Sequence, residues 1–232
     1  MTDYRNFRFN KLRTKEFSHI LLLLYWPIYG LLFLWVERFA NFDYNYIYCF
    51  LDDLIPFCEY FIIPYYFWFA YLIGMLVYTF FFDTECFRKF MVYIILTYTI
   101  AILIYIIYPN AQNLRPSELE RDNIFTRIVG YLYGFDTNTN VCPSIHVLGS
   151  MAVFFAAINT ERIKSFWIKA LFLALTVLIS ISTVFLKQHS VIDILVAVPM
   201  GILFYFPAFR PELFHIKRKN PQGEAYENSG NN

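Results

Sequence analysis

The chain has 232 residues, of which 58% are hydrophobic, 22% aromatic and only 16% charged, and its formal net charge is +1. Soluble domains carry about 25% charged residues, so this composition excludes an ordinary soluble domain. Several apolar runs reach the roughly 20 residues that a helix needs to cross a bilayer. The sequence therefore predicts an all-α, polytopic membrane protein, and nothing in it points to a nucleic-acid partner.

Six transmembrane helices in a helical bundle account for the apolar sequence. The last apolar stretch, residues 166–206, is too long for one span at about 1.5 Å per residue, and residues 187–189 are its most polar point. The predicted helices cover about residues 20–36, 60–82, 90–108, 144–158, 166–187 and 189–206. The chain then divides into a basic N-terminus (1–19), a six-helix domain (20–208) and a polar tail (209–232).

Two polar segments interrupt the helices. The linker 37–58 carries Asp52 and Asp53, and its aromatic part, residues 44–56, fits the membrane interface; the sequence gives the linker no other role. The longer segment, 110–141, holds apolar residues at steps of three and four between its acidic positions. That spacing predicts a short amphipathic helix that lies on the membrane or acts as a lid.

The basic residues fall unevenly on the two sides of this topology. Cytoplasmic loops of membrane proteins carry an excess of Lys and Arg. One side receives Arg5, Arg8, Lys11, Arg13, Lys15, Arg88, Lys89, Arg162, Lys164, Lys169, Arg210, Lys217, Arg218 and Lys219, and the other receives Arg38, Arg115, Arg121, Arg127 and Lys187. We expect a multi-pass protein of the cell membrane with both termini in the cytoplasm.

Two polar islands, residues 142–147 and 182–193, then lie at the outer face. His146 begins the fourth helix, which runs inward, and His189 begins the sixth, which also runs inward. Both histidines therefore lie at one depth, near Arg115 in the preceding loop. Ionisable groups that converge inside a membrane protein indicate a functional site.

The spacing within the islands suits a histidine that acts as a nucleophile or a base. His189 and Asp193 are four residues apart and share one helix face, so the carboxylate can fix the imidazole tautomer and leave the other nitrogen free. Ser144 is a good N-cap for the fourth helix, whose free backbone N–H groups can bind phosphate oxygens. Each feature alone also has a purely structural explanation, either a self-satisfied His–Asp pair or ordinary capping.

The order of these motifs resembles that of the type 2 phosphatidic acid phosphatase superfamily. Residues 143–146, Pro-Ser-Ile-His, resemble its Pro-Ser-Gly-His motif, and the Ser-Thr-x5-His-x3-Asp pattern over residues 182–193 resembles its Ser-Arg-x5-His-x3-Asp motif. Arg115-Pro116 is similar to the end of its Lys-x6-Arg-Pro motif. The resemblance covers about residues 108–200 and implies a six-helix bundle of the same kind.

The resemblance also implies roles. His189 would attack phosphorus, Asp193 would orient it and His146 would protonate the leaving oxygen. Arg115 would clamp the phosphate, since a guanidinium can bind two oxygens at once. No metal or other cofactor would be required.

The chain departs from the family pattern at three positions. Tyr108 stands where the first motif has lysine, Thr183 where the third has arginine, and Ile145 where the second has glycine. Two phosphate-binding cations are thus absent, and we expect Lys187 to replace them, together with the backbone at Ser144 and Ile145. The Pro-Ser-Ile-His form, with a bulky residue in place of glycine, and the Lys-Gln-His sequence at residues 187–189 together resemble the branch of inositol-phosphorylceramide-synthase-like proteins and their bacterial relatives.

The sequence thus predicts a membrane-embedded phosphatase that hydrolyses a phosphomonoester or pyrophosphate lipid through a phosphohistidine. Its partners would be a lipid phosphate substrate and the bilayer, while the oligomeric state stays open. The alternatives are a phosphotransferase that moves the head group to an alcohol, a non-catalytic phosphate-binding transporter or scaffold, and a metallohydrolase. A metal fits the spacing of His146, His189 and Asp193 less well than it would fit a His-x3-His pair.

Overall fold

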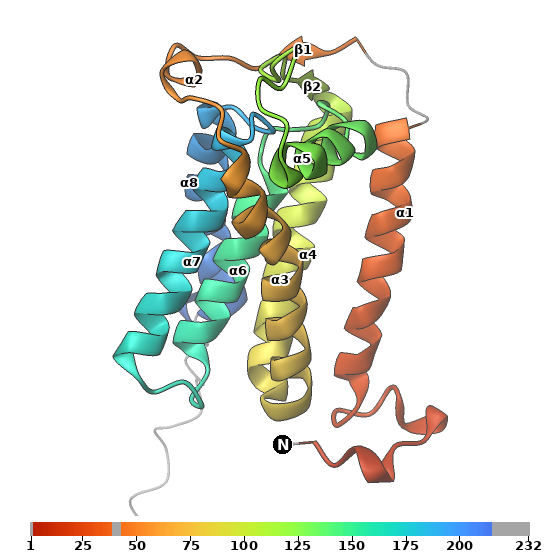
Figure 1. Ribbon diagram of the computed structural model, residues 1–232. Helices are drawn as coiled ribbons and strands as arrows, with labels where there is room; N and C mark the ends of the chain where they lie inside the picture. Colours follow the sequence, from red (N-terminus) through yellow and green to blue (C-terminus); the bar gives the residue numbers. More distant parts are fainter. Residues whose placement is uncertain (1, 39–42, 215–232) are drawn as a thin grey trace, which may run out of the picture.

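The computed structural model describes residues 2–38 and 43–214, which form a bundle of long helices with short elements across one end (Figure 1). The long helices are α1 (Tyr25–Arg38), α3 (Ile62–Phe82), α4 (Thr84–Ile107), α6 (Ile145–Asn159), α7 (Phe166–Phe185) and α8 (Val191–Phe209). The shorter elements are β1 (Asn45–Tyr46), α2 (Leu51–Leu54), β2 (Asn110–Ala111), α5 (Ile124–Phe135) and the 3-10 turns η1 (Tyr4–Asn6), η2 (Phe9–Lys11), η3 (Ser18–Leu24), η4 (Glu59–Phe61) and η5 (Pro211–Phe214).

The helices confirm a helical membrane protein. Among the described residues, five segments are long and apolar enough to cross a bilayer: Ser18–Arg38, Glu59–Phe82, Thr84–Ile107, Phe166–Phe185 and Val191–Phe209. The apolar helix α6 is shorter, at 15 residues. Six spanning helices therefore stay a prediction, in which α6 would be the sixth.

Helix α6 lies at the centre of the bundle, where it packs against α3, α4, α7 and α8 (Figure 1). Most of its side chains are buried, and many are small, including Gly149, Ser150, Ala152 and Ala156. Small residues let membrane helices approach closely, where dispersion contacts stabilise them. This packing fixes the N-terminal turn of α6, and with it His146, against its neighbours.

We expect Gly149→Ala to destabilise the fold by about 1–3 kcal/mol, the usual cost of an added methyl group in a packed interior. A Cβ there would lie 2.5 Å from the Tyr98 hydroxyl and 3.0 Å from the Trp68 ring. Thermal unfolding in detergent measures the loss. Gly74→Ala is the matched control because a Cβ at Gly74 has nothing within 4 Å; equal unfolding temperatures for the two variants would contradict the close packing.

The start of α4 corrects one predicted boundary. The sequence predicted a turn over residues 83–89, but α4 begins at Thr84, so Asp83 alone separates α3 from α4. The Asp83 carboxylate accepts from the Cys86 backbone N–H at 3.1 Å and from the Thr160 hydroxyl at 2.6 Å. An Asp N-cap supports helix initiation directly after another helix, and the polar residues that suggested a turn lie in the first turns of α4.

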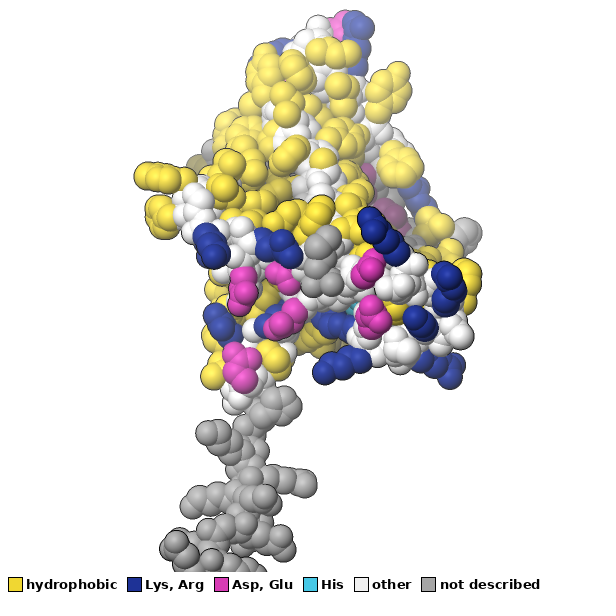
Figure 2. Space-filling model, turned by 90° about the horizontal axis from the view of Figure 1, so that it is seen from below, with side chains coloured by type: hydrophobic (Ala, Val, Ile, Leu, Met, Phe, Trp, Pro, Cys, Tyr) yellow, Lys and Arg dark blue, Asp and Glu magenta, His cyan; other side chains and the backbone are white. Residues whose placement is uncertain are grey.

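The N-terminal segment lies at the end of the bundle opposite α5 (Figure 1). The Arg88 side chain of α4 donates to the Lys15 carbonyl at 2.8 Å and to the Ser18 hydroxyl at 3.1 Å. Seen from below, Lys, Arg, Asp and Glu side chains gather across this end beside a large hydrophobic surface (Figure 2). Its cytoplasmic location stays a prediction, and the polar tail from residue 215 lies outside the described residues.

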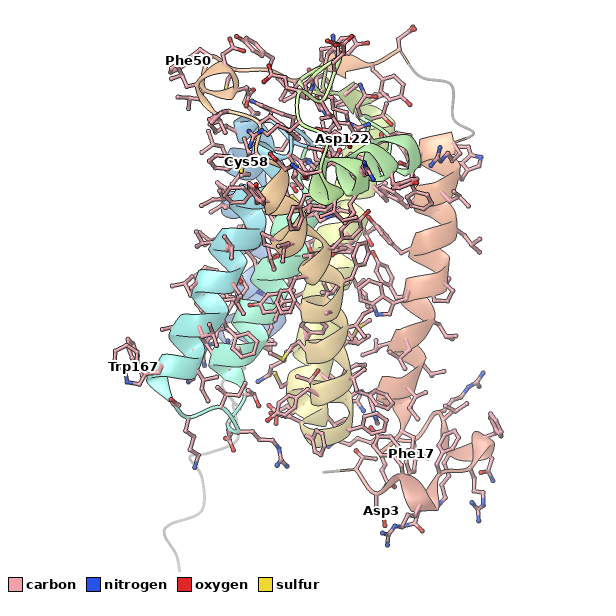
Figure 3. The ribbon with its side chains drawn as sticks, viewed as in Figure 1. Asp3, Phe17, Phe50, Cys58, Asp122 and Trp167 are labelled. Atoms are coloured by element: carbon pink, nitrogen blue, oxygen red, sulfur yellow. The ribbon has the colours of Figure 1, made fainter. Side chains whose placement is uncertain are left out.

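Short elements close the other end. β1 pairs in parallel with β2, Asn45 opposite Asn110, and thereby joins the linker to the loop before α5. The predicted amphipathic helix is α5, which the Asn123 side chain caps. Figure 3 shows Phe50, Cys58 and Asp122 at this end, and Asp3, Phe17 and Trp167 at the opposite one. The linker, α5 and the starts of α6 and α8 therefore meet at one end of the bundle.

Candidate active site

His189 lies in the turn between α7 and α8. Helix α8 begins at Val191 with Ser190 as its N-cap, so His189 precedes the helix instead of standing on its face as the sequence predicted. The pairing with Asp193 still forms: His189 Nδ1 lies 3.0 Å from Asp193 Oδ2, which also accepts the Ser190 backbone N–H at 3.0 Å. A carboxylate at Nδ1 holds the proton there and leaves Nε2 with its lone pair.

His146 lies in the first turn of α6, beside His189. The two imidazole centroids are 5.6 Å apart. The His146 ring is held between Tyr65 and Trp68 of α3, with centroid distances of 4.6 Å and 4.5 Å. Its Nδ1 is buried and has no hydrogen-bond partner, and a buried polar atom without a partner is costly enough to suggest a functional role.

A cavity of about 560 Å³ opens in front of the two histidines. Its polar end includes His146, His189 and Gln188, and Ile145, next to His146 in the chain, also lines it. Its apolar walls come from α1, α3 and α5, with Phe33, Leu34, Phe69, Leu132 and Phe135 among the lining residues. A cavity that joins paired imidazoles to an apolar wall can hold a polar head group and the start of an attached apolar chain.

Two carboxylates line the same cavity, and the sequence analysis missed both. Asp136 accepts a hydrogen bond from the Tyr65 hydroxyl at 3.1 Å, and Glu37 accepts one from the Thr137 hydroxyl at 2.7 Å. Burial, followed by the charge of Glu37, raises the pKa of the Asp136 carboxyl above its ordinary value. Asp136 was visible in the sequence only as the end of the amphipathic segment, and Glu37 only as the first residue of the linker 37–58.

Arg115 lies near the histidines, but its guanidinium is already occupied. It donates to the carbonyls of Tyr133, Asp136 and Thr137 at 2.8–3.1 Å and to the Gln188 side-chain oxygen at 2.6 Å. Arg115 is not among the cavity-lining residues. It therefore fastens the end of α5 to the α7–α8 turn, and a phosphate that it clamped would have to displace these acceptors.

Lys187 is directed away from the cavity. Its ammonium donates to the backbone carbonyls of Asp52 at 2.6 Å and Ile55 at 2.5 Å, both in the linker. The structure thus does not bring this predicted replacement cation to the two histidines.

Ser144 and Ile145, the remaining predicted phosphate-binding residues, do lie at the site. The Ser144 hydroxyl is 3.3 Å from His189 Nε2, and Ser144 is the N-cap of α6. Ile145 follows it and lines the cavity. The Ser144 N–H donates to the Asp193 carbonyl at 3.4 Å and the Val147 N–H to the Ser144 hydroxyl at 3.5 Å. The N–H groups of Ile145 and His146 have no acceptor within the helix, so they are the donors that this end offers to an anion. Within residues 2–38 and 43–214, no three His, Cys, Asp or Glu side chains group as a metal site.

The sequence of this region matches a known family. A model of the PAP2 superfamily matches residues 92–213, from within α4 to η5, which is more than half of the chain. The chain belongs to the PAP2 superfamily. No curated protein and no solved structure matches it. Membership supports a phosphatase-type activity on lipid phosphates in general, and it agrees with the resemblance of residues 108–200 at the level of the superfamily.

Proposed function

We propose that this protein is a membrane phosphatase that hydrolyses a phosphomonoester or pyrophosphate lipid through a phosphohistidine at His189. The observation that carries the proposal is the convergence of three groups. His189 has its Nδ1 on Asp193 at 3.0 Å, and His189 and His146 both line a cavity that also has apolar walls. A nucleophile, its orienting carboxylate and a second proton-transfer group are the elements that covalent phosphoryl transfer needs.

The reaction has two steps. In the first, His189 Nε2 attacks phosphorus, the bond between phosphorus and the ester oxygen breaks, and His146 donates a proton to the departing oxygen. In the second, His146 takes a proton from water, the water oxygen bonds to phosphorus, and the N–P bond breaks to release phosphate. The backbone donors at the start of α6 stabilise the charge that builds on the phosphoryl oxygens. None of these steps uses a metal.

The proposed orientation places the histidines at the outer membrane face. The N-terminal segment lies at the opposite end of the bundle (Figure 1), and the cation-rich loops predict that end to be cytoplasmic. The substrate would enter sideways from the bilayer between apolar walls, with its phosphate at the interface.

A second candidate is transfer of a phosphoryl-containing head group to an alcohol, and the carboxylates of Glu37 and Asp136 favour it. Both line the cavity together with Arg38, whose guanidinium donates to the Phe135 carbonyl, while Arg115 and Lys187 donate elsewhere. The two ionised carboxylates therefore outnumber the one cation among these lining residues. A phosphomonoester carries nearly two negative charges near pH 7 and a phosphodiester only one, so two carboxylates repel the diester less. The same nucleophile and proton donor would serve both reactions.

A phosphate-release assay over a panel of lipid phosphates tests the proposal. The panel should contain isoprenyl phosphates and pyrophosphates, phosphatidate and phosphatidylglycerophosphate, with lipid products analysed in the same samples. Release of free phosphate supports hydrolysis, while a new phosphodiester lipid in the presence of an acceptor alcohol supports the second candidate. Binding of vanadate without any turnover would overturn both.

We expect Asp136→Asn to lower KM for a phosphomonoester about fivefold near neutral pH, equivalent to about 1 kcal/mol for one removed charge. The pKa of Asp136 is raised by burial, so the carboxyl ionises later in a pH titration than an ordinary aspartate. KM of the unmodified protein should thus rise as pH increases through that pKa, and the rise should be weaker in the variant.

The asparagine oxygen can still accept from Tyr65, so the variant changes charge more than structure. Asp122→Asn is the matched control because Asp122 is exposed and pairs with Arg127 at 2.8 Å at the other end of α5. If both variants keep the KM of the unmodified protein across the pH range, Asp136 does not act on the substrate through its charge.

A further inference from the structure

The linker contributes a buried carboxylate to the turn that carries His189. Asp52 lies in α2, in a polar segment, yet its exposed fraction is 1%. Its Oδ2 accepts from the Ser190 hydroxyl at 2.6 Å and from the Cys49 N–H at 2.8 Å, and its Oδ1 accepts from the Val191 N–H at 2.8 Å. The Asp52 side chain, far away in the sequence, therefore binds Ser190 and Val191 at the start of α8.

Ser190 connects this carboxylate to the site. Its hydroxyl binds Asp52, and its backbone N–H donates to Asp193 Oδ2 at 3.0 Å, the same oxygen that His189 Nδ1 contacts. The position of the 190 peptide sets the direction of the Asp193 oxygen, which sets the orientation of the imidazole. Asp52 is thus connected to the His189–Asp193 pair through a single intervening residue, Ser190.

The linker also holds the other side of the turn. Lys187 has a φ of 53°, in the left-handed region that non-glycine residues seldom occupy. The Lys187 ammonium binds the Asp52 and Ile55 carbonyls, and the Cys58 N–H donates to the Phe185 carbonyl at 3.0 Å. Residues on both sides of His189 are thus fastened to the linker, which opposes relaxation of this backbone to a commoner conformation.

Helix capping alone does not account for Asp52. Helix α8 already has a complete capping box, in which the Ser190 side chain accepts from the helix and Asp193 accepts from the Ser190 N–H. A second buried carboxylate at the same helix end costs desolvation, and it adds contacts where the orientation of His189 is decided.

We propose that Asp52 is a positioning residue for His189, acting through Ser190 and the first peptide groups of α8. This inference rests on the proposed function, because positioning matters only if His189 reacts. It also gives the linker 37–58 a role in the site and explains the direction of Lys187. Lys187 is a structural tie that brings the Asp52 segment against the turn, in place of the phosphate-binding cation expected from the sequence.

Asp52→Asn tests the proposal with little change in volume. An amide oxygen can replace only part of the three hydrogen bonds that the carboxylate accepts, and hydrogen bonds to a charged acceptor are stronger than those to a neutral one. We expect kcat for phosphate release to fall at least about tenfold, the equivalent of about 1.4 kcal/mol. KM should stay unchanged, because Asp52 does not line the cavity.

Asp53→Asn is the matched control. Asp53 is the next residue, is exposed, and accepts a hydrogen bond from the exposed Tyr48 hydroxyl, so its variant should keep both kinetic constants. Ser190→Ala removes the hydroxyl bond to Asp52 together with the cap on the Ile192 N–H, and it leaves the Val191 contact with Asp52. It is the second test if Asp52→Asn does not fold. The double variant should lose less than the product of the two single losses because both changes break one connection.

A readout without substrate separates this proposal from the proposed function. Diethyl pyrocarbonate acylates the free nitrogen of a neutral imidazole, and peptide mass spectrometry measures each histidine separately. His189 acylation should slow about tenfold in Asp52→Asn and stay unchanged in Asp53→Asn, whether or not a substrate is known. An unchanged His189 rate in folded Asp52→Asn and Ser190→Ala would overturn the positioning role. Turnover that survives in His189→Ala would overturn the proposed function instead.

Discussion

Replacing His189 with alanine is expected to reduce turnover of a lipid phosphate by at least about 10⁴-fold, because loss of a nucleophile removes the covalent route and leaves only the contributions of binding and charge. The Asp193 carboxylate would remain, but it would lack the imidazole that lies 3.0 Å away in the unmodified protein. Initial rates of phosphate release in detergent measure the effect. The variant should stay folded and elute like the unmodified protein, but it should unfold at a lower temperature because the buried Asp193 carboxylate loses its imidazole partner.

A distant histidine provides the control for this experiment. His19 is buried at the opposite end of the bundle, where its Nε2 lies 2.7 Å from the Tyr4 hydroxyl. His19→Gln keeps a polar partner for Tyr4 and should keep the rate. Brief reaction with a labelled substrate should also yield an acid-labile phosphoprotein, and His189→Ala should abolish it. Phosphate release at the normal rate by folded His189→Ala would contradict a nucleophilic role for His189.

The sequence was sufficient to place His146 and His189 together because helix direction alternates along the chain. Apolar runs of membrane length set the directions of the helices, and two helices of the same direction bring their first turns to one end. In the structure these two helix starts lie side by side, and the imidazole centroids of His146 and His189 are 5.6 Å apart. The same argument explains why Arg88 of α4 meets the basic N-terminal segment at the other end, where it donates to the Lys15 backbone carbonyl.

Helix boundaries were harder to predict from the sequence where the hydrogen bonds of a capping residue determine the helix start. Helix α4 starts at Thr84 because Asp83 accepts the Cys86 N–H, and α8 starts at Val191 because Ser190 and Asp193 form a capping box. Hydrophobic periodicity reports the apolar face and is insensitive to one turn of polar residues at a helix start. His189 consequently lies in a turn, where its orientation depends on contacts from other segments.

Apart from the His189–Asp193 pair, the partners of the charged side chains at the site could not be inferred from spacing. Lys187 and Arg115 looked like phosphate ligands because both are cations near the histidines. However, their donors are taken by carbonyl groups of the linker and of the end of α5. Asp52 and Asp136 are polar loop residues in the sequence and reach the site only when β1 pairs with β2 and α5 covers the bundle end. Such contacts join segments that no local pattern relates.

The role of His146 predicts an effect that depends on the leaving group. We expect His146→Ala to lower kcat/KM for an alkyl phosphate by about 10²–10⁴-fold, the usual contribution of a positioned proton donor. An aryl phosphate of similar size has a leaving oxygen that departs without a proton, and its kcat/KM should fall less than about tenfold. The measurement is the ratio of the two constants in the variant and in the unmodified protein.

This ratio separates proton donation from structural damage. The His146 ring packs against Tyr65 and Trp68, so its removal can disturb the site, but any loss of folded protein lowers both constants by the same factor. In a two-step reaction kcat/KM includes only the steps up to release of the alcohol, so the later role of His146 in activating water does not enter it. An equal loss for both substrates would show that His146 supports the site without protonating the leaving oxygen.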